Sequence, residues 1–177
     1  MMRALVVYES MYGNTRQVAE AVAHGLGRSV LARAVSVAEV AAADVAGCGL
    51  LVVGGPTHVH GMSRASTRHS AATVAEATGS RSIEPHADAG IRDWLAQLRP
   101  DVPGQKAAAF DTRAQGPALL TGRASKGIAV QLREAGFELV SEPESFKVTS
   151  APELGPDEIE RARLWGESLA AKIAPAI

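Results

Sequence analysis

The sequence predicts an α/β fold in which a doubly wound parallel sheet carries helices on both faces. Short apolar runs alternate with segments of helical periodicity along most of the chain, an order typical of βαβ units. Three of the apolar runs are continuous rather than alternating, as expected for parallel strands that are buried on both sides. The five expected strands are Ala4–Tyr8, Val30–Val35, Leu50–Val53, Ala107–Phe110 and Phe137–Val140.

Helices are expected in the crossovers between these strands and after the last of them. Val18, Val22 and Leu26 share one face of a helix that follows Asn14, because residues three or four apart lie on the same side. The short segment Ala38–Val45 connects the second and third strands. Further apolar stripes predict helices over 91–98, over 128–135 with Gly136 as the C-cap, and over 159–173 after Pro156.

Two segments interrupt the alternation of strands and helices. Between the third and fourth strands the chain is rich in Ser, Thr, Ala and Arg, and a structureless loop of that length is unusual inside a compact domain. We therefore expect a single domain over 1–177 with an insertion at about 63–88, helical near Ser70–Ala77, at the mouth of the sheet. Polar residues over Ser141–Ser145 interrupt the fifth strand before Phe146–Val148.

Composition argues against several classes of protein. Hydrophobic residues make up 46% of the 177 residues and charged residues 21%, close to the average of globular proteins. The net charge of −1 comes from 18 basic and 19 acidic residues, which does not suggest binding to nucleic acid. The single cysteine excludes a disulfide framework, and no apolar run is long enough for a secretory signal or a membrane-spanning helix. We therefore expect a cytoplasmic protein without a membrane span.

The turn after the first strand, Ser10–Thr15, has the character of a phosphate-binding loop. A phosphate there would meet backbone N–H groups and the positive end of the following helix. Gly13 permits a positive φ, and the hydroxyls of Ser10 and Thr15 add donors. The chain has no GxxxxGK[ST] and no GxGxxG after this strand, so nucleotide-hydrolysing P-loops and dinucleotide folds are excluded. The alternative is an ordinary strand-to-helix turn in which Asn14 or Thr15 only caps the helix.

Residues 10–15, Ser-Met-Tyr-Gly-Asn-Thr, resemble the FMN phosphate loop of flavodoxins. The first four of them are more similar to the NAD(P)H:quinone oxidoreductases related to the tryptophan-repressor-binding protein. A second motif, Gly55-Pro56-Thr57 followed after three residues by Gly61-Met62-Ser63, resembles the flavin-ring loop of both groups. The resemblance implies a flavodoxin-like, five-stranded parallel sheet in the order 2-1-3-4-5. FMN would lie outside the carboxyl ends of the strands, as in flavodoxin itself.

The resemblance also implies which residues bind the cofactor. They lie in the loops after the first, third and fourth strands. No catalytic residue follows from the sequence with a defined role, and the candidates are His60 and Arg113. The first loop contributes Ser10, Met11, Tyr12, Gly13, Asn14 and Thr15, the second Pro56, Thr57, His58, Val59, His60 and Gly61, and the third Asp111, Thr112, Arg113 and Gly116.

The third loop, Asp111–Gly116, departs from the flavodoxin pattern because it contains no aromatic residue. Flavodoxins commonly hold the ring between two aromatic side chains and surround it with acidic residues. An arginine near the ring, such as Arg113, would instead favour the anionic, two-electron-reduced flavin. The alternative for Arg113 is a surface position or an ion pair with Asp111.

His58 and His60 form an H-x-H pair, whose rings point to one side of an extended segment. A metal site would need a third ligand, such as His69, His86 or Asp88, and no close ligand spacing supports one. We therefore predict no metal, and we expect the two histidines to face solvent, to pack against the flavin or to protonate it.

These features predict an FMN-binding redox protein that reduces a quinone or another small acceptor by two electrons with NAD(P)H. Arg64, Arg68 and Arg81 could hold a phosphate of the nicotinamide dinucleotide or a protein partner. One alternative is an electron shuttle that docks to redox partner proteins, although a net charge of −1 offers little electrostatic steering. Another is a binding module that has lost FMN. The insertion would cover the cofactor or make a contact in a homo-oligomer.

Overall fold

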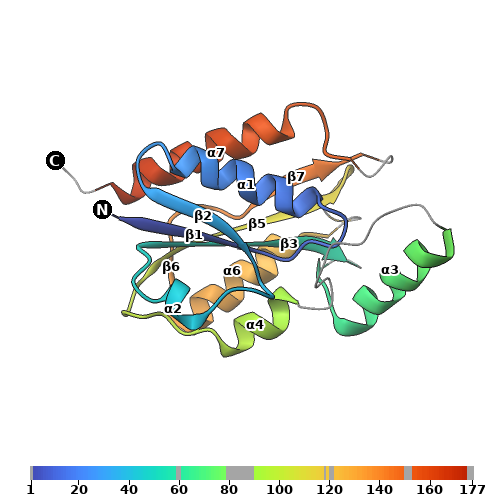
Figure 1. Ribbon diagram of the computed structural model, residues 1–177, viewed down its shortest axis with the longest axis horizontal. Helices are drawn as coiled ribbons and strands as arrows, with labels where there is room; N and C mark the ends of the chain where they lie inside the picture. Colours follow the sequence, from blue (N-terminus) through green and yellow to red (C-terminus); the bar gives the residue numbers. More distant parts are fainter. Residues whose placement is uncertain are drawn as a thin grey trace.

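The computed structural model describes residues 2–58, 61–78, 90–117, 119, 122–149 and 153–174. Within them a sheet lies between two layers of helices (Figure 1). The strands are β1 Arg3–Tyr8, β2 Leu31–Ser36, β3 Leu50–His58, β4 Gly61–Met62, β5 Lys106–Ala114, β6 Glu138–Leu139 and β7 Glu144–Val148. The helices are α1 Asn14–Leu26, α2 Ala42–Val45, α3 Ala65–Thr78, α4 Ile91–Gln97, α6 Ala124–Ala135 and α7 Glu158–Ile173.

The order of the strands is β2-β1-β3-β5-β6, with β7 also paired to β5 and β4 folded back on β3. The pairing of β4 with β3 is antiparallel, and the pairings of the other described strands are parallel. Since β5 is the fourth of the expected strands, and β6 and β7 together form the fifth, the predicted order 2-1-3-4-5 is confirmed. The interruption of the fifth strand is also confirmed, although it ends earlier than predicted, because β6 ends at Leu139 and β7 already begins at Glu144.

Two central strands are longer than predicted. β3 runs to His58 and β5 to Ala114, past the ends of their apolar runs. Gly54–Pro56 pair in register with Phe110–Thr112, so the sheet continues where the side chains have already become small or polar. The prediction of a loop over Asp111–Gly116 is therefore wrong for its first four residues, which belong to β5.

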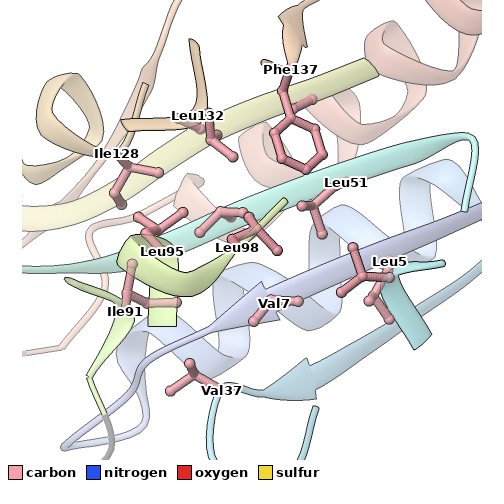
Figure 2. Close-up of a cluster of buried hydrophobic side chains, with 14 of the residues drawn as sticks. Leu5, Val7, Val37, Leu51, Ile91, Leu95, Leu98, Ile128, Leu132 and Phe137 are labelled. Atoms are coloured by element: carbon pink, nitrogen blue, oxygen red, sulfur yellow. The ribbon is translucent and has the colours of Figure 1, made fainter. Parts of the chain in front are cut away.

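Successive residues of the central strands face opposite layers, which explains their continuously apolar sequences. In β1, Leu5 and Val7 belong to the core cluster formed with α2, α4 and α6 (Figure 2). Ala4 and Val6 belong to the cluster on the other face, formed with α1 and α7. Both layers of helices are therefore held to the sheet by buried apolar side chains, and the carboxyl ends of the strands are left to carry the site.

Helices α1 and α7 lie side by side (Figure 1) and approach each other closely at two glycines. A Cβ atom at Gly25 would lie 2.0 Å from the carbonyl oxygen of Arg163, and one at Gly166 would lie 2.3 Å from that of Val22. No side chain fits at such distances, so the two glycines allow the backbones of the helices to touch.

Helix α3 stands beyond the carboxyl edge of the sheet (Figure 1). The helix predicted near 70–77 is confirmed, and it begins earlier, where the N–H of Arg64 donates to Thr67 Oγ1 over 2.8 Å. The hydroxyl of Tyr12 donates to the carbonyl oxygen of Ala71 over 3.2 Å, which ties α3 to the loop after β1. Residues 79–89 of the expected insertion lie outside the described residues. Among the described residues, none of the helices has both the length and the apolar composition that a membrane span requires.

Candidate functional site

The loop between β1 and α1 is shaped for an anion at the start of a helix. Gly13 is the N-cap of α1 and has a φ of 90°, a left-handed conformation that favours glycine. Its N–H donates to Ser10 Oγ over 3.1 Å, so the hydroxyl proton of Ser10 can still be donated to an acceptor. The first turn of α1 reads Asn-Thr-Arg-Gln and carries no acidic residue. The positive end of this 13-residue helix therefore faces the loop without a neutralising carboxylate in its first turn.

Two buried threonines connect this loop to the central strand β5. Thr15 Oγ1 and Thr112 Oγ1 lie 2.8 Å apart, and the residues are only 2% and 4% exposed. One hydroxyl donates to the other, and the accepting hydroxyl keeps its own proton for a further acceptor. The predicted first and third loops are therefore neighbours, with a hydroxyl proton available between them.

The predicted second loop lies at the turn from β3 to β4. Thr57 pairs with Met62 and His58 with Gly61, so the chain reverses direction within a few residues. Val59 and His60, which come between these two pairs in the sequence, lie outside the described residues. Burial, together with the charge of Arg68, lowers the pKa of His58 below its ordinary 6.5, which favours the neutral imidazole at neutral pH.

The side chains of Thr57 and Asp111 hold the start of α6. The N–H of Ala124 donates to Thr57 Oγ1 over 3.0 Å, and the N–H of Ser125 donates to Asp111 Oδ2 over 2.7 Å. Both N–H groups belong to the first turn of the helix, where no backbone acceptor is available. Asp111 is fully buried, and its carboxylate also lies at the positive end of the helix dipole. The side chain of Asp111 therefore has a structural role, because it holds the start of α6.

Arg113 lies near the end of β5 and is 8% exposed, so it is not the surface residue that we considered as an alternative. Its Nη1 donates to the carbonyl oxygen of Gly116 over 2.9 Å, which holds the turn that follows the strand. Lys147 in β7 pairs in register with Arg113. Burial lowers the pKa of Lys147, and the positive charge of Arg113 lowers it further. The end of β5 thus brings two positive charges together, with the carboxylates of Glu158 and Asp111 also close enough to act on Lys147.

A buried network at the end of β1 was not predicted from the sequence. Glu9 is 3% exposed, accepts a hydrogen bond from the Ser63 hydroxyl, and accepts another at Oε2 from the N–H of Ile91 over 2.9 Å. Arg68 Nη1 donates to Ser63 Oγ over 2.9 Å, and its Nη2 lies 3.3 Å from Asp93 Oδ2. Burial raises the pKa of Glu9 above its ordinary 4.5, although the hydrogen bonds oppose this. The one sign of this network in the sequence is Glu9, an acidic residue placed directly after an apolar strand.

The described histidines and acidic residues do not gather as metal ligands do. Within the described part of the chain, no group of three His, Cys, Asp or Glu side chains is placed to hold a metal ion. His86 and Asp88, two of the possible third ligands for an H-x-H site, lie outside that part.

Comparison with known proteins gives a family for these features. The family model described as Flavodoxin matches residues 6–165. No curated protein sequence matches the chain.

Solved structures share the fold at low sequence identity. A flavodoxin from the domain Archaea is 20% identical, with a TM-score of 0.66 over 97% of this chain and 99% of that one. Flavodoxin 1 from Bacillus cereus is 17% identical, with a TM-score of 0.63 over 99% of each chain. The flavodiiron core of Flv1 from Synechocystis is 17% identical, with a TM-score of 0.62 over 97% of this chain but 36% of that one. At these identities the likeness establishes the fold.

Proposed function

The chain belongs to the flavodoxin family of FMN-binding electron-transfer proteins, and on that premise we propose that it reduces a quinone or another small acceptor by two electrons with NAD(P)H. When bound, FMN would supply the redox chemistry, which is hydride and electron transfer between the nicotinamide and the acceptor. In balance, NAD(P)H, one proton and a quinone become NAD(P)⁺ and a hydroquinone. The residues of this chain bind the cofactor and set the charge around it.

The FMN phosphate would lie at the loop Ser10–Thr15. The observations that favour this position are the left-handed Gly13, the available protons of the Ser10 hydroxyl and the threonine pair, and the start of α1. The ring would lie between Pro56–Gly61 and Arg113–Gly116, at the carboxyl ends of β3 and β5. The phosphate loop and the two ring loops follow three separate strands, β1, β3 and β5, which the core holds in place.

The distribution of buried charge is the observation that carries the two-electron proposal. Arg113 is 8% exposed and lies next to one expected ring loop, whereas the charge of Arg68, 5% exposed beside the other, is balanced by its pair with Asp93. The buried carboxylates nearby, Glu9 and Asp111, accept hydrogen bonds from the first turns of α4 and α6. Cations near the ring stabilise its anionic, two-electron-reduced form, whereas acidic surroundings disfavour it. This balance suits a two-electron reductase better than a one-electron carrier.

Space beside the ring also supports a small substrate. The third loop has no aromatic residue, and the hydroxyl of Tyr12 in the first loop donates to α3. Without a two-sided aromatic clamp, a nicotinamide or quinone ring has room to stack on the flavin.

The test is anaerobic reduction of the FMN-loaded protein by NADH or NADPH, followed by addition of a quinone. We expect loss of the flavin absorbance with the nucleotide alone, and one hydroquinone formed for each nucleotide oxidised. Free FMN at the same concentration is the control. A protein that stays oxidised with NAD(P)H, but is reduced once a flavodoxin reductase is added, would contradict the proposal and identify an electron shuttle.

A further inference from the structure

A cavity of about 340 Å³ opens at the carboxyl edge of the sheet, between the β3–β4 turn, the start of α3 and α4. Gly61 and Met62 form part of its wall. Its polar lining comes from His58, Arg64, Ser66, Thr67 and Arg92. Of the described residues, no acidic one lines it. The cavity is therefore positively charged, and it adjoins the turn expected to face the flavin ring.

Two arginines from different segments line this cavity. Arg92 in α4 is fixed there, because its Nη2 donates to the carbonyl oxygen of Met62 over 3.1 Å and its Nε to that of Ser63 over 3.3 Å. Arg64 comes just before α3 and is exposed, and within the described residues its guanidinium has no ion pair. A hydrogen-bonded and an exposed arginine that line one space suit a phosphoryl group, since the guanidinium fork matches phosphate oxygens.

The surroundings of the cavity leave this charge available. Asp93, the nearest acidic side chain in the network, pairs with Arg68, and the Glu9 carboxylate is buried in its own hydrogen bonds. Ser66 and Thr67 lie in the first turn of α3, whose positive end adds to the field of the arginines. The volume is at the lower end for a ligand pocket, and is therefore suited to one part of a nucleotide rather than to a whole dinucleotide.

We infer that this cavity is a phosphate subsite that holds a phosphoryl group of the nicotinamide nucleotide, with Arg64 and Arg92 as its ligands. The inference rests on the proposed function for the identity of the nucleotide. It adds a second phosphate site, separate from the loop Ser10–Thr15, which is reserved for FMN. A nucleotide anchored here would place its nicotinamide beside the β3–β4 turn.

The experiment is titration of the FMN-loaded protein with inorganic pyrophosphate, followed by NMR of the His58 ring, with His58→Gln to assign the signal. His58 lines the cavity, and its pKa is lowered by burial and by Arg68, so an anion bound beside it raises that pKa. We expect a saturable rise with pyrophosphate and at least tenfold weaker binding in Arg64→Gln and in Arg92→Gln. Arg133→Gln, which removes an exposed arginine from α6, is the matched control and binds as the wild type does.

Further variants and ligands distinguish a failure of the subsite from a failure of the proposed function. Arg64→Gln keeps the test valid if Arg92→Gln does not fold, because the exposed Arg64 guanidinium holds no element in place. Malonate binding as tightly as pyrophosphate would overturn the phosphate assignment, as would competition between pyrophosphate and FMN. Reduction by NADPH with no effect of pyrophosphate on His58 would overturn the subsite and leave the proposed function standing. Pyrophosphate binding in a protein that NAD(P)H does not reduce would overturn the nicotinamide assignment together with the proposed function.

Discussion

The hydroxyl oxygens of Thr15 and Thr112 lie 2.8 Å apart, at a point where the first turn of α1 meets the end of β5. The two residues are 97 positions apart in the sequence, and both are buried. Through this contact, the loop proposed for the phosphate and the strand that leads to the proposed ring loop hold each other in position. The affinity for FMN should therefore depend on hydroxyl groups that are already placed before the cofactor arrives.

The double variant Ser10→Ala with Thr15→Ala is expected to bind FMN at least tenfold more weakly than the wild type. Each substitution removes a hydroxyl from the proposed phosphate site, and a hydrogen bond to a charged group contributes about 1.5–3 kcal/mol. Titration calorimetry of the apoprotein with FMN measures the change. Urea unfolding of the apo variant checks that it folds, and unchanged affinity would show that the loop does not hold the phosphate.

Gly166→Ala is expected to lower the free energy of unfolding, although alanine is the better helix former. Its Cβ would lie 2.3 Å from the carbonyl oxygen of Val22, and forcing α7 away from α1 costs about 1–3 kcal/mol. Urea unfolding measures the loss. The matched control is Gly127→Ala in α6, where the new Cβ meets only the flexible end of Met62 at 3.1 Å. The close contact would be refuted if both variants were stabilised alike by the gain in helix propensity of about 1 kcal/mol.

The stability of the wild type relative to Glu9→Gln is expected to fall as the pH rises above about 4.5. Burial raises the pKa of Glu9 in the folded protein above its ordinary 4.5, so the folded state binds this proton more tightly than the unfolded state. The contribution of Glu9 is complete below the unfolded pKa and is lost as the pH rises through the folded pKa. Urea unfolding of both proteins between pH 4 and pH 8 follows the difference.

Glu39→Gln is the control for this prediction, because Glu39 is exposed. Its difference from the wild type should not follow the same course with pH. A wild type that gains stability over Glu9→Gln with rising pH would mean that the hydrogen bonds from Ser63 and Ile91 outweigh burial and lower the pKa of Glu9.

The strands could be predicted because burial on both faces requires a continuously apolar sequence, whereas their order followed from the resemblance to flavodoxins. Leu50–Val53 must be apolar throughout, since alternate residues enter the two separate core clusters. The ends of β3 and β5 have no continuous apolar sequence of this kind. Gly54–Pro56 and Asp111–Ala114 continue the sheet through backbone pairing, which a small or polar side chain does not reveal.

The candidate site was predictable only where it is local in sequence. Gly13 and Ser10 stand in one turn, so their geometry follows from a few adjacent residues. The partners of Glu9 are far along the chain: Ser63 lies 54 positions away and Ile91 lies 82 positions away. Nothing in the spacing of these residues indicates that tertiary packing brings them together.

The last prediction concerns Arg113, because its charge carries the argument for two-electron chemistry. Arg113→Glu is expected to lower the potential of the second reduction step of bound FMN, since a negative charge opposes the anionic reduced flavin. A charge contribution of about 1 kcal/mol corresponds to about 40 mV for a one-electron step, and the low exposure of Arg113 favours a shift of at least this size. Arg113→Lys keeps the charge without the guanidinium fork, so it separates the electrostatic effect from the loss of the hydrogen bond to Gly116. The potential of this variant should stay near that of the wild type.

Spectroelectrochemical titration gives both potentials, and photoreduction of the wild type should pass to the fully reduced flavin with little of the one-electron form. Accumulation of that form in the wild type would identify a one-electron carrier, and an unchanged second potential in Arg113→Glu would show that the guanidinium lies too far from the ring to act on it.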